Sequence, residues 1–190
     1  MVDKYNISEL KAILHGYIDN NTNIVLSDLI DFKQILSGIN NIITLKTTQL
    51  FVKELLKNHI ISFKQYETII YKTNNNSANA NGYDVEFCGN ICKNVNGIVA
   101  EIKCNIPVKG NVFGATQIQG IRNDIHNLIY GKHKSKIKDT ANYYKFMGIL
   151  NVAGAESAMS KIIDSYSNGE VVKFEKTNSN RLSVNNVYIT

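Results

Sequence analysis

The residues best suited to chemistry lie in a short apolar run, Ile98-Val99-Ala100-Glu101-Ile102-Lys103-Cys104, which carries one carboxylate and one ammonium group. In a β-strand the side chains at positions i and i+2 share a face, so Glu101 and Lys103 are expected to point the same way. Removing charges from water in an apolar strand is costly unless they have partners. The pair therefore indicates a functional site.

A second run, Tyr83-Asp84-Val85-Glu86-Phe87, has the same alternation and adds acids. The two runs predict strands over 83–88 and 98–104 that pair as an antiparallel hairpin or meander. The turn between them is expected to contain Asn94, Asn96 and Gly97. This pairing would place Asp84 near Glu101.

A different interpretation of the same charges needs no site. Glu101 and Lys103 would then form a solvated cross-strand pair with Glu86 and Lys93 on an exposed sheet face.

The composition limits the kind of protein that carries this feature. With 190 residues, 44% of them hydrophobic, the chain is expected to be a single globular domain. A net charge of +5 favours an anionic partner such as nucleic acid. No apolar run approaches the roughly 20 residues that span a bilayer, and no signal sequence is visible, so we expect a cytoplasmic protein without a membrane partner. Three cysteines without an export signal favour reduced thiols; no C-x-x-C spacing supports a zinc site.

Apolar periodicity predicts several helices before the hairpin. They run from about Ser8 to Asp19, from Ser27, from Thr47 or Thr48, and from Ser62 to near Tyr71. The polar stretch 73–82 is expected to be a loop.

After the hairpin the pattern predicts helices over 115–130 and 156–166, and strands over 143–152, 171–175 and 186–189. The fold class is therefore α/β, of a mixed α+β kind. Within the single domain 1–190 we expect a helical N-terminal subregion over 1–60, a core over 62–152, and a C-terminal helix with strands over 153–190.

Asp84, followed after a gap by Glu101-Ile102-Lys103, resembles the D…(D/E)xK signature of the PD-(D/E)xK nuclease superfamily, to which many restriction endonucleases and several repair nucleases belong. The resemblance covers residues 66–152. It implies a restriction-endonuclease-like fold, with a central mixed sheet flanked by helices and an N-terminal helical region. The proline of the motif is absent, and the family's third core strand is placed either at 69–73 or around 91–95.

The resemblance also implies roles for the residues that carry it. Asp84, Glu101 and the carbonyl of Ile102 would bind Mg²⁺, or Mn²⁺ in its place, because hard cations prefer oxygen ligands. Lys103 would orient or deprotonate the attacking water, or stabilise the transition state.

Other residues extend this set. Glu86, Glu67 and Glu54 are candidates for an additional acid. Gln117, at the start of the following helix, is a candidate for the catalytic set, and Gln119 is its alternative.

A basic run near the middle of the chain offers candidate DNA contacts. They are Lys132, Lys134, Lys136 and Lys138, with Arg122 from the preceding helix. A solvated loop is the interpretation that the sequence alone favours for this run.

Together these patterns predict a Mg²⁺-dependent DNA endonuclease, of a restriction or defence type, that acts as a homodimer if it cuts both strands. The alternatives are a noncatalytic nucleic-acid-binding protein on the same fold and a structural or partner-binding module.

Overall fold

The computed structural model describes residues 26–75, 82–108, 110–175 and 181–190. The chain divides into two compact units, Met1–Asn40 and Asn41–Thr190. The described elements follow in the order α2 (Leu26–Lys57), α3 (Phe63–Asn75), β1 (Val85–Cys92), β2 (Val95–Lys103), α4 (Ala115–Tyr130), β3 (Tyr143–Ile149), α5 (Ala155–Ile163), β4 (Val171–Lys173) and β5 (Val187–Ile189). The helix expected from Ser8 to Asp19 lies outside the described residues.

The strands form one mixed sheet in the order β1-β2-β3-β5-β4. β1 is antiparallel to β2, and the remaining neighbours are parallel. The expected mixed α/β class, with a central mixed sheet flanked by helices, is confirmed.

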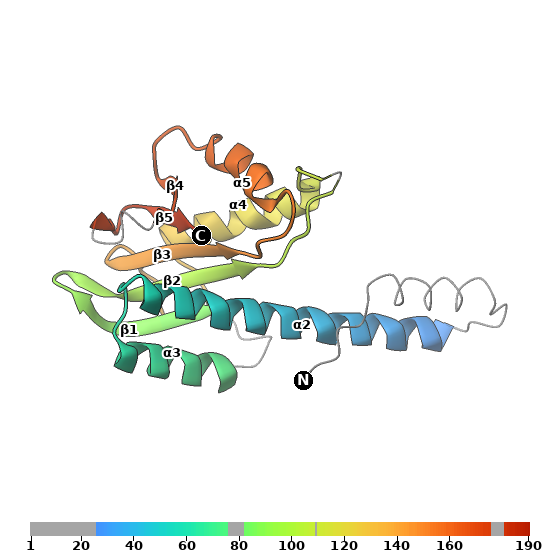
Figure 1. Cartoon of the computed structure of the whole chain (residues 1–190), viewed down its shortest axis with the longest axis horizontal. Helices are drawn as coiled ribbons and strands as arrows, with labels where there is room; N and C mark the ends of the chain where they lie inside the picture. Colours follow the sequence, from blue (N-terminus) through green and yellow to red (C-terminus); the bar gives the residue numbers. More distant parts are fainter. Residues whose placement is uncertain (1–25, 76–81, 109, 176–180) are drawn as a thin grey trace. The chain divides into compact units, whose positions relative to one another are not determined.

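Helices cover both faces of this sheet (Figure 1). On one face, Phe51, Val52 and Leu55 of α2 and Ile69 of α3 pack against β1, β2 and β3. On the other face, α4 and α5 pack against β2, β3 and β5. The strand β2 therefore has a hydrophobic layer on each side, with Ile98 and Ala100 in one layer and Val99 in the other, as expected for a strand buried on both faces.

The two helices expected from Ser27 and from Thr47 or Thr48 form one continuous helix, α2. Thr47 and Thr48 do not cap a new helix: their hydroxyl groups donate hydrogen bonds to the carbonyl oxygens of Ile43 and Thr44, four residues earlier, at 2.9 and 2.8 Å. Because a threonine can bond in either way, the sequence alone does not separate a cap from a mid-helix position. Within the described residues, no helix is long and apolar enough to cross a membrane.

Ser62 caps α3 as expected. Its hydroxyl accepts a hydrogen bond from the Gln65 amide at 3.3 Å, and the Gln65 side chain accepts one from the Ser62 amide at 2.7 Å. Together they form a reciprocal capping box. The helix runs on to Asn75, so residues 69–73 are helical and not the third strand suggested by the resemblance. The first residues of the expected loop 73–82 are therefore helical as well, and 76–81 lie outside the described residues.

The hairpin has the expected antiparallel pairing, but its turn is shorter than predicted. Cys92 pairs with Val95, and Asn94 has a left-handed backbone, with φ of 66°. Asn96 and Gly97 belong to β2 and not to the turn. Residues 91–95 therefore provide no extra strand.

The remaining elements follow the predictions closely. α4 begins and ends where expected, at Ala115 and Tyr130. β3, α5, β4 and β5 lie within three residues of their predicted bounds at every end.

Candidate functional site

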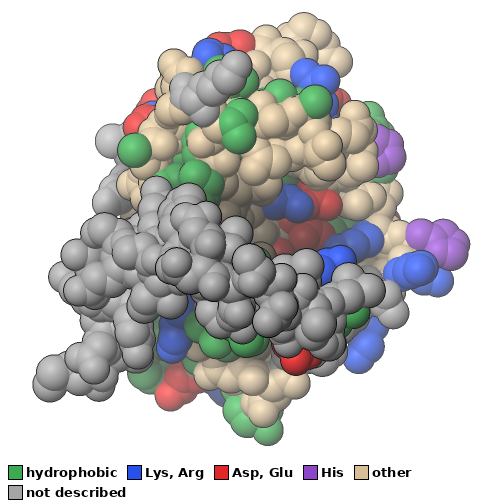
Figure 2. Space-filling view, turned by 90° about the vertical axis from the view of Figure 1, so that its right-hand side faces the viewer, with side chains coloured by type: hydrophobic (Ala, Val, Ile, Leu, Met, Phe, Trp, Pro, Cys, Tyr) green, Lys and Arg blue, Asp and Glu red, His purple; other side chains and the backbone are tan. Residues whose placement is uncertain are grey.

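Acidic and basic side chains gather where β1 begins and β2 ends. Asp84 and Glu86 alternate with core residues of the first strand, and Glu101 and Lys103 alternate with core residues of the second. Since their neighbours in sequence face α2 and α3, these charged side chains face α4. Seen from the end of the sheet toward which β2 points, acidic and basic side chains lie side by side in a hollow (Figure 2).

The Asp84 carboxylate is fixed by the backbone of β2. Its Oδ2 atom accepts a hydrogen bond from the Ile102 amide at 2.7 Å. In a strand the amide and the carbonyl of one residue point to the same side, so the Ile102 carbonyl also points toward Asp84. The expected proximity of Asp84 to the Glu101-Ile102-Lys103 segment is confirmed.

The Glu101 side chain is buried, with 5% of its surface exposed. Its Oε1 atom lies 2.9 Å from the Nζ atom of Lys132, and the same ammonium group donates to the Gly82 carbonyl at 2.7 Å. The interpretation as a solvated cross-strand pair is therefore wrong: Glu101 lies inside the protein, and its partner comes from the segment after α4.

Burial is the main cause of the unusual titration of both acids. Together with the neighbouring Asp84 charge, burial raises the pKa of Glu101 to about 8, against the lowering effect of Lys132. Burial also raises the pKa of Asp84, against hydrogen bonds from the Ile102 amide and the Glu101 carboxyl group.

Lys103 lies on the expected face but has a partner that the sequence did not indicate. Its ammonium group forms an ion pair with Asp124 of α4. Asp124 also acts on Glu101, because its negative charge contributes to the raised pKa of that carboxyl group. Asp124 lies three residues after Ile121 and beside Ile125, at the margin of the buried face of α4. That position is the only sequence signal that could have found it.

The segment after α4 covers the acids. Ser135 donates to Glu86 Oε1 at 2.7 Å, and the same oxygen accepts from the Tyr83 amide at 2.9 Å. Lys132 Nζ lies 5.6 Å from the centre of the Tyr83 ring, and Ile137 is buried in the core beside α4. Glu86 is thus part of this polar cluster.

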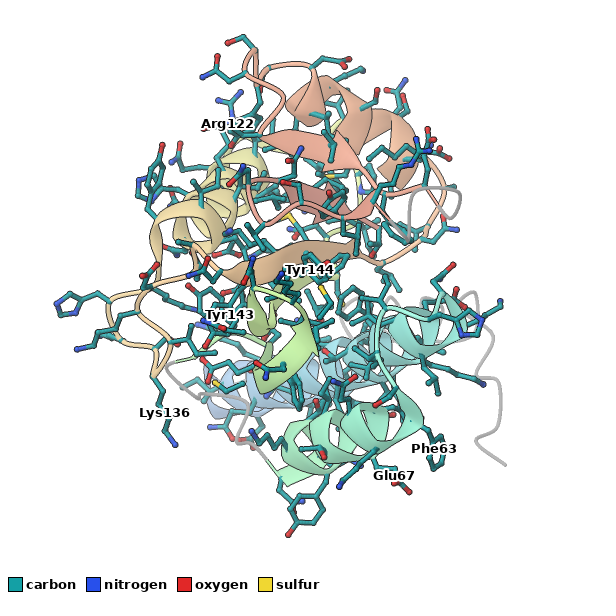
Figure 3. All side chains as sticks on the ribbon, turned by 90° about the vertical axis from the view of Figure 1, so that its left-hand side faces the viewer. Phe63, Glu67, Arg122, Lys136, Tyr143 and Tyr144 are labelled. Atoms are coloured by element: carbon teal, nitrogen blue, oxygen red, sulfur yellow. The ribbon has the colours of Figure 1, made fainter. Side chains whose placement is uncertain are left out.

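Three other predicted residues are not brought to Asp84 and Glu101. Gln117 accepts from the Gly114 amide at 2.9 Å and donates to the Ile106 carbonyl at 3.3 Å, so it caps α4. Glu54 and Glu67 lie on α2 and α3, whose core residues pack on the opposite face of the sheet. Glu54 pairs with Lys57 on its own helix, and Glu67 is exposed on α3 (Figure 3).

The predicted DNA-binding residues separate into two groups. Lys134, Lys136 and Lys138 are exposed, as is Arg122, whose guanidinium lies 3.4 Å from the Ser165 hydroxyl; Figure 3 shows Lys136 extending away from the protein. Lys132 is partly buried and faces the acids. Sequence patterns carry no signal for this difference, because the path of the loop depends on tertiary packing.

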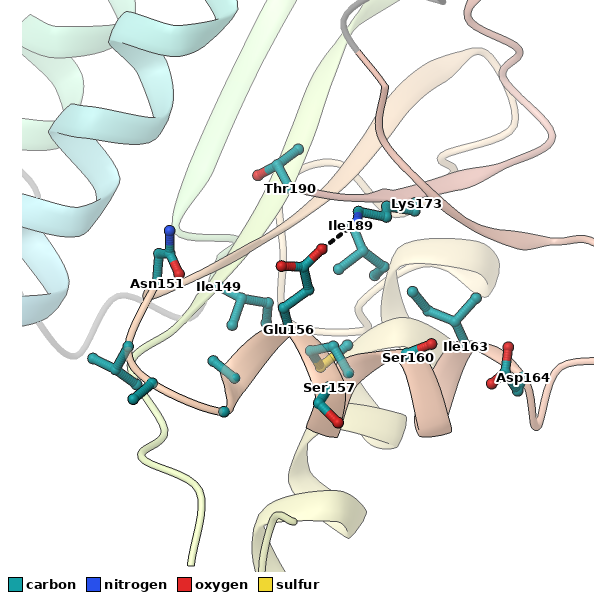
Figure 4. A pocket seen from close by; sticks show the side chains of 15 residues that line it. Ile149, Asn151, Glu156, Ser157, Ser160, Ile163, Asp164, Lys173, Ile189 and Thr190 are labelled. Atoms are coloured by element: carbon teal, nitrogen blue, oxygen red, sulfur yellow. Dashed lines mark hydrogen bonds and ion pairs between the residues drawn. The ribbon is translucent and has the colours of Figure 1, made fainter. Parts of the chain in front are cut away.

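A cavity of about 970 Å³ lies elsewhere along the carboxyl ends of the parallel strands, between β3, β5 and α5. Figure 4 shows Glu156 and Lys173 joined by an ion pair at this cavity. Both side chains are well exposed. None of the residues that line it belongs to the polar cluster around Asp84 and Glu101.

The donor set around Asp84 suits one kind of cation. Mg²⁺ is usually bound by one or two carboxylates and several waters. Asp84, Glu101 and the Ile102 carbonyl offer hard oxygen atoms of this kind. Among the described residues, no group of three or more His, Cys, Asp or Glu side chains is arranged to hold a metal ion. The cluster also holds more acids than lysines: Asp84, Glu86, Glu101 and Asp124 against Lys103 and Lys132.

No protein-family model, curated protein or solved structure matches this chain.

Proposed function

We propose that the protein is a metal-dependent endonuclease that hydrolyses phosphodiester bonds in DNA. The observation that carries the proposal is the hydrogen bond from the Ile102 amide to the Asp84 carboxylate, which places Asp84 beside Glu101, with Lys103 two residues along the same face of β2. The resemblance of Asp84…Glu101-Ile102-Lys103 to the PD-(D/E)xK signature supports the same function. DNA is the substrate that this resemblance implies.

The side chains have complementary roles in this reaction. Asp84 and Glu101, with the Ile102 carbonyl, would hold Mg²⁺, or Mn²⁺ in its place. When bound, the ion supplies Lewis-acid stabilisation of the phosphate charge and a water of lowered pKa. Asp124 holds the Lys103 ammonium in one position by their ion pair. Lys103 would then orient the attacking water or stabilise the charge that develops on the phosphate.

The remaining features belong to the same proposal. Lys134, Lys136 and Lys138 would contact the DNA backbone from the exposed side of their loop. A restriction or defence role, a homodimer for double-strand cleavage, and a cytoplasmic location are further parts of it.

The test is nicking of supercoiled plasmid DNA by the purified protein with Mg²⁺ or Mn²⁺. We expect Asp84→Asn, Glu101→Gln and Lys103→Ala each to lower the rate by at least about a hundredfold. Glu67→Gln is the matched control, because it removes an exposed carboxylate on α3, and it should cleave like the wild type. Cleavage that survives Asp84→Asn and Glu101→Gln would rule out this site.

One observation favours a second function, a noncatalytic nucleic-acid-binding protein. Both lysines of the cluster already pair with acids, Lys132 with Glu101 and Lys103 with Asp124. Such internal pairs reduce the need for a metal ion. DNA binding without cleavage under any divalent metal would support this function, and failure to bind nucleic acid would favour the structural or partner-binding module.

A further inference from the structure

The loop from Gly131 to Lys138 is fixed over the acids by the side chains of Lys132 and Ser135 on its inner side, and its Ile137 is buried in the core beside α4. Lys132 binds Glu101 and the Gly82 carbonyl, and Ser135 binds Glu86. The intervening residues face outward: His133, Lys134 and Lys136 are exposed. The same loop therefore contacts the acids on one side and presents lysines to solvent on the other.

The Lys132 ammonium lies where positive charge is most needed. It touches the buried Glu101 carboxyl group and a backbone carbonyl, both of them oxygen ligands. The charges of Asp84 and Asp124 also act on it. Buried acids without a counter-charge are strongly unfavourable, so a cation of some kind must lie close to this pair. In the protein by itself that cation is Lys132.

We propose that Lys132 is a tethered cation, which a divalent metal ion displaces from Glu101 on binding. The inference rests on the proposed function, since it takes Asp84 and Glu101 as the metal ligands. A divalent ion bound to Glu101 would repel the Lys132 ammonium group, which lies 2.9 Å from the same carboxyl group, so the two cations compete. Displacement of Lys132 from Glu101 breaks one of the inner hydrogen bonds of the loop and loosens the segment that carries Lys134 and Lys136. Metal binding and the exposure of the basic loop are thereby coupled, and the coupling is reciprocal.

The first test measures Mn²⁺ affinity by calorimetry. Lys132→Met keeps the apolar stem and removes the competing charge, so we expect Mn²⁺ to bind about tenfold more tightly than in the wild type, a typical coupling. Lys136→Met is the matched control, because it removes an exposed charge of the same loop, and its affinity should equal that of the wild type. Unchanged or weaker binding in Lys132→Met overturns the proposal, as does the absence of Mn²⁺ binding in every variant.

The second test needs no substitution at Lys132, so it remains decisive if Lys132→Met fails to fold. We expect Mn²⁺ to speed tryptic cleavage of the wild type after Lys134 and Lys136, and to have no such effect in Glu101→Gln. Protection by Mn²⁺, or an unchanged cleavage rate, overturns the proposal.

The two proposals fail in different ways. Tighter Mn²⁺ binding in Lys132→Met together with inactivity on DNA would refute the nuclease function and keep the tethered cation. Metal-dependent DNA cleavage that requires Glu101, together with equal Mn²⁺ affinity in Lys132→Met and the wild type, would refute the tethered cation alone.

Discussion

At the scale of single residues, the protein buries two charged groups in different ways. Glu101 is 5% exposed and has an ammonium partner in Lys132, whereas Lys145 on β3 is 4% exposed and, among the described residues, donates to the backbone carbonyls of Tyr143 and Val184. A carbonyl dipole compensates a buried ammonium less well than a carboxylate does. Burial accordingly lowers the pKa of Lys145 to about 8. Burial of the Lys145 charge should therefore cost more folding free energy than burial of the Glu101 charge.

Replacing Lys145 by methionine should stabilise the protein by about 1 kcal/mol at pH 7, because the charged form of a buried lysine is disfavoured in the folded state. The folded pKa of about 8 lies below the ordinary value of 10.5. The cost of Lys145 is thus fully present below pH 8 and declines as the pH rises toward 10.5. Urea unfolding at pH 7 and pH 9.5 measures the free energy of unfolding of the variant and the wild type. The difference between these two free energies should be smaller at the higher pH.

The control for this experiment is Lys64→Met, which removes an exposed lysine on α3. The difference in the free energy of unfolding between Lys64→Met and the wild type should not depend on pH. A Lys145→Met difference that stays constant over the same interval would show that the lysine does not lose its proton there.

At the scale of elements, sequence patterns predicted the helix bounds and the strand pairing that depend on residues near in sequence. α4 was predicted at both ends because its apolar residues recur with helical spacing between Gly114 and Gly131. The contact of Asp84 with the segment that holds Glu101 followed from strand pairing alone. The ion-pair partners of Lys103 and Glu101 did not, because Asp124 and Lys132 reach the sheet through the path of α4 and its following loop. That path depends on packing between elements distant in sequence, for which periodicity gives no signal.

A substitution at Gly97 can test the pairing of β1 with β2, which aligns Asp84 with Glu101. Gly97 has φ of 154°, and a Cβ atom there would lie 1.9 Å from the Phe87 carbonyl oxygen of the paired strand. Gly97→Ala should therefore destabilise the protein by about 2 kcal/mol or more, since the atom in the way belongs to the Phe87 backbone, which is held by strand pairing. Gly120→Ala, inside α4 with open space around it, should instead be neutral or stabilise by up to about 1 kcal/mol. Thermal unfolding of both variants measures the contrast, and similar effects would show that β1 and β2 do not pair in this register.

At the scale of the whole molecule, the net charge of +5 attracts any polyanion, so it cannot by itself show where DNA would bind. The distribution of lysines between the two faces of the sheet makes the question testable. One group, Lys134, Lys136 and Lys138, lies on the loop beside the acids; another, Lys53, Lys64 and Lys72, is exposed on α2 and α3. Both groups carry the same charge, so net charge and position can be separated.

Replacing the three loop lysines by serine should weaken DNA binding and flatten its salt dependence by about 0.9 in slope for each lysine that contacts a phosphate. Fluorescence anisotropy of a labelled duplex, without divalent metal and over about 50 to 200 mM salt, gives this slope. The matched triple replacement at Lys53, Lys64 and Lys72 removes the same charge from the helices over the opposite face. It should lower affinity only slightly and leave the slope nearly unchanged, because charges that do not touch phosphate release no counterions. Equal losses in the two triples would mean that net charge alone governs binding and that the loop beside Asp84 and Glu101 does not hold the DNA.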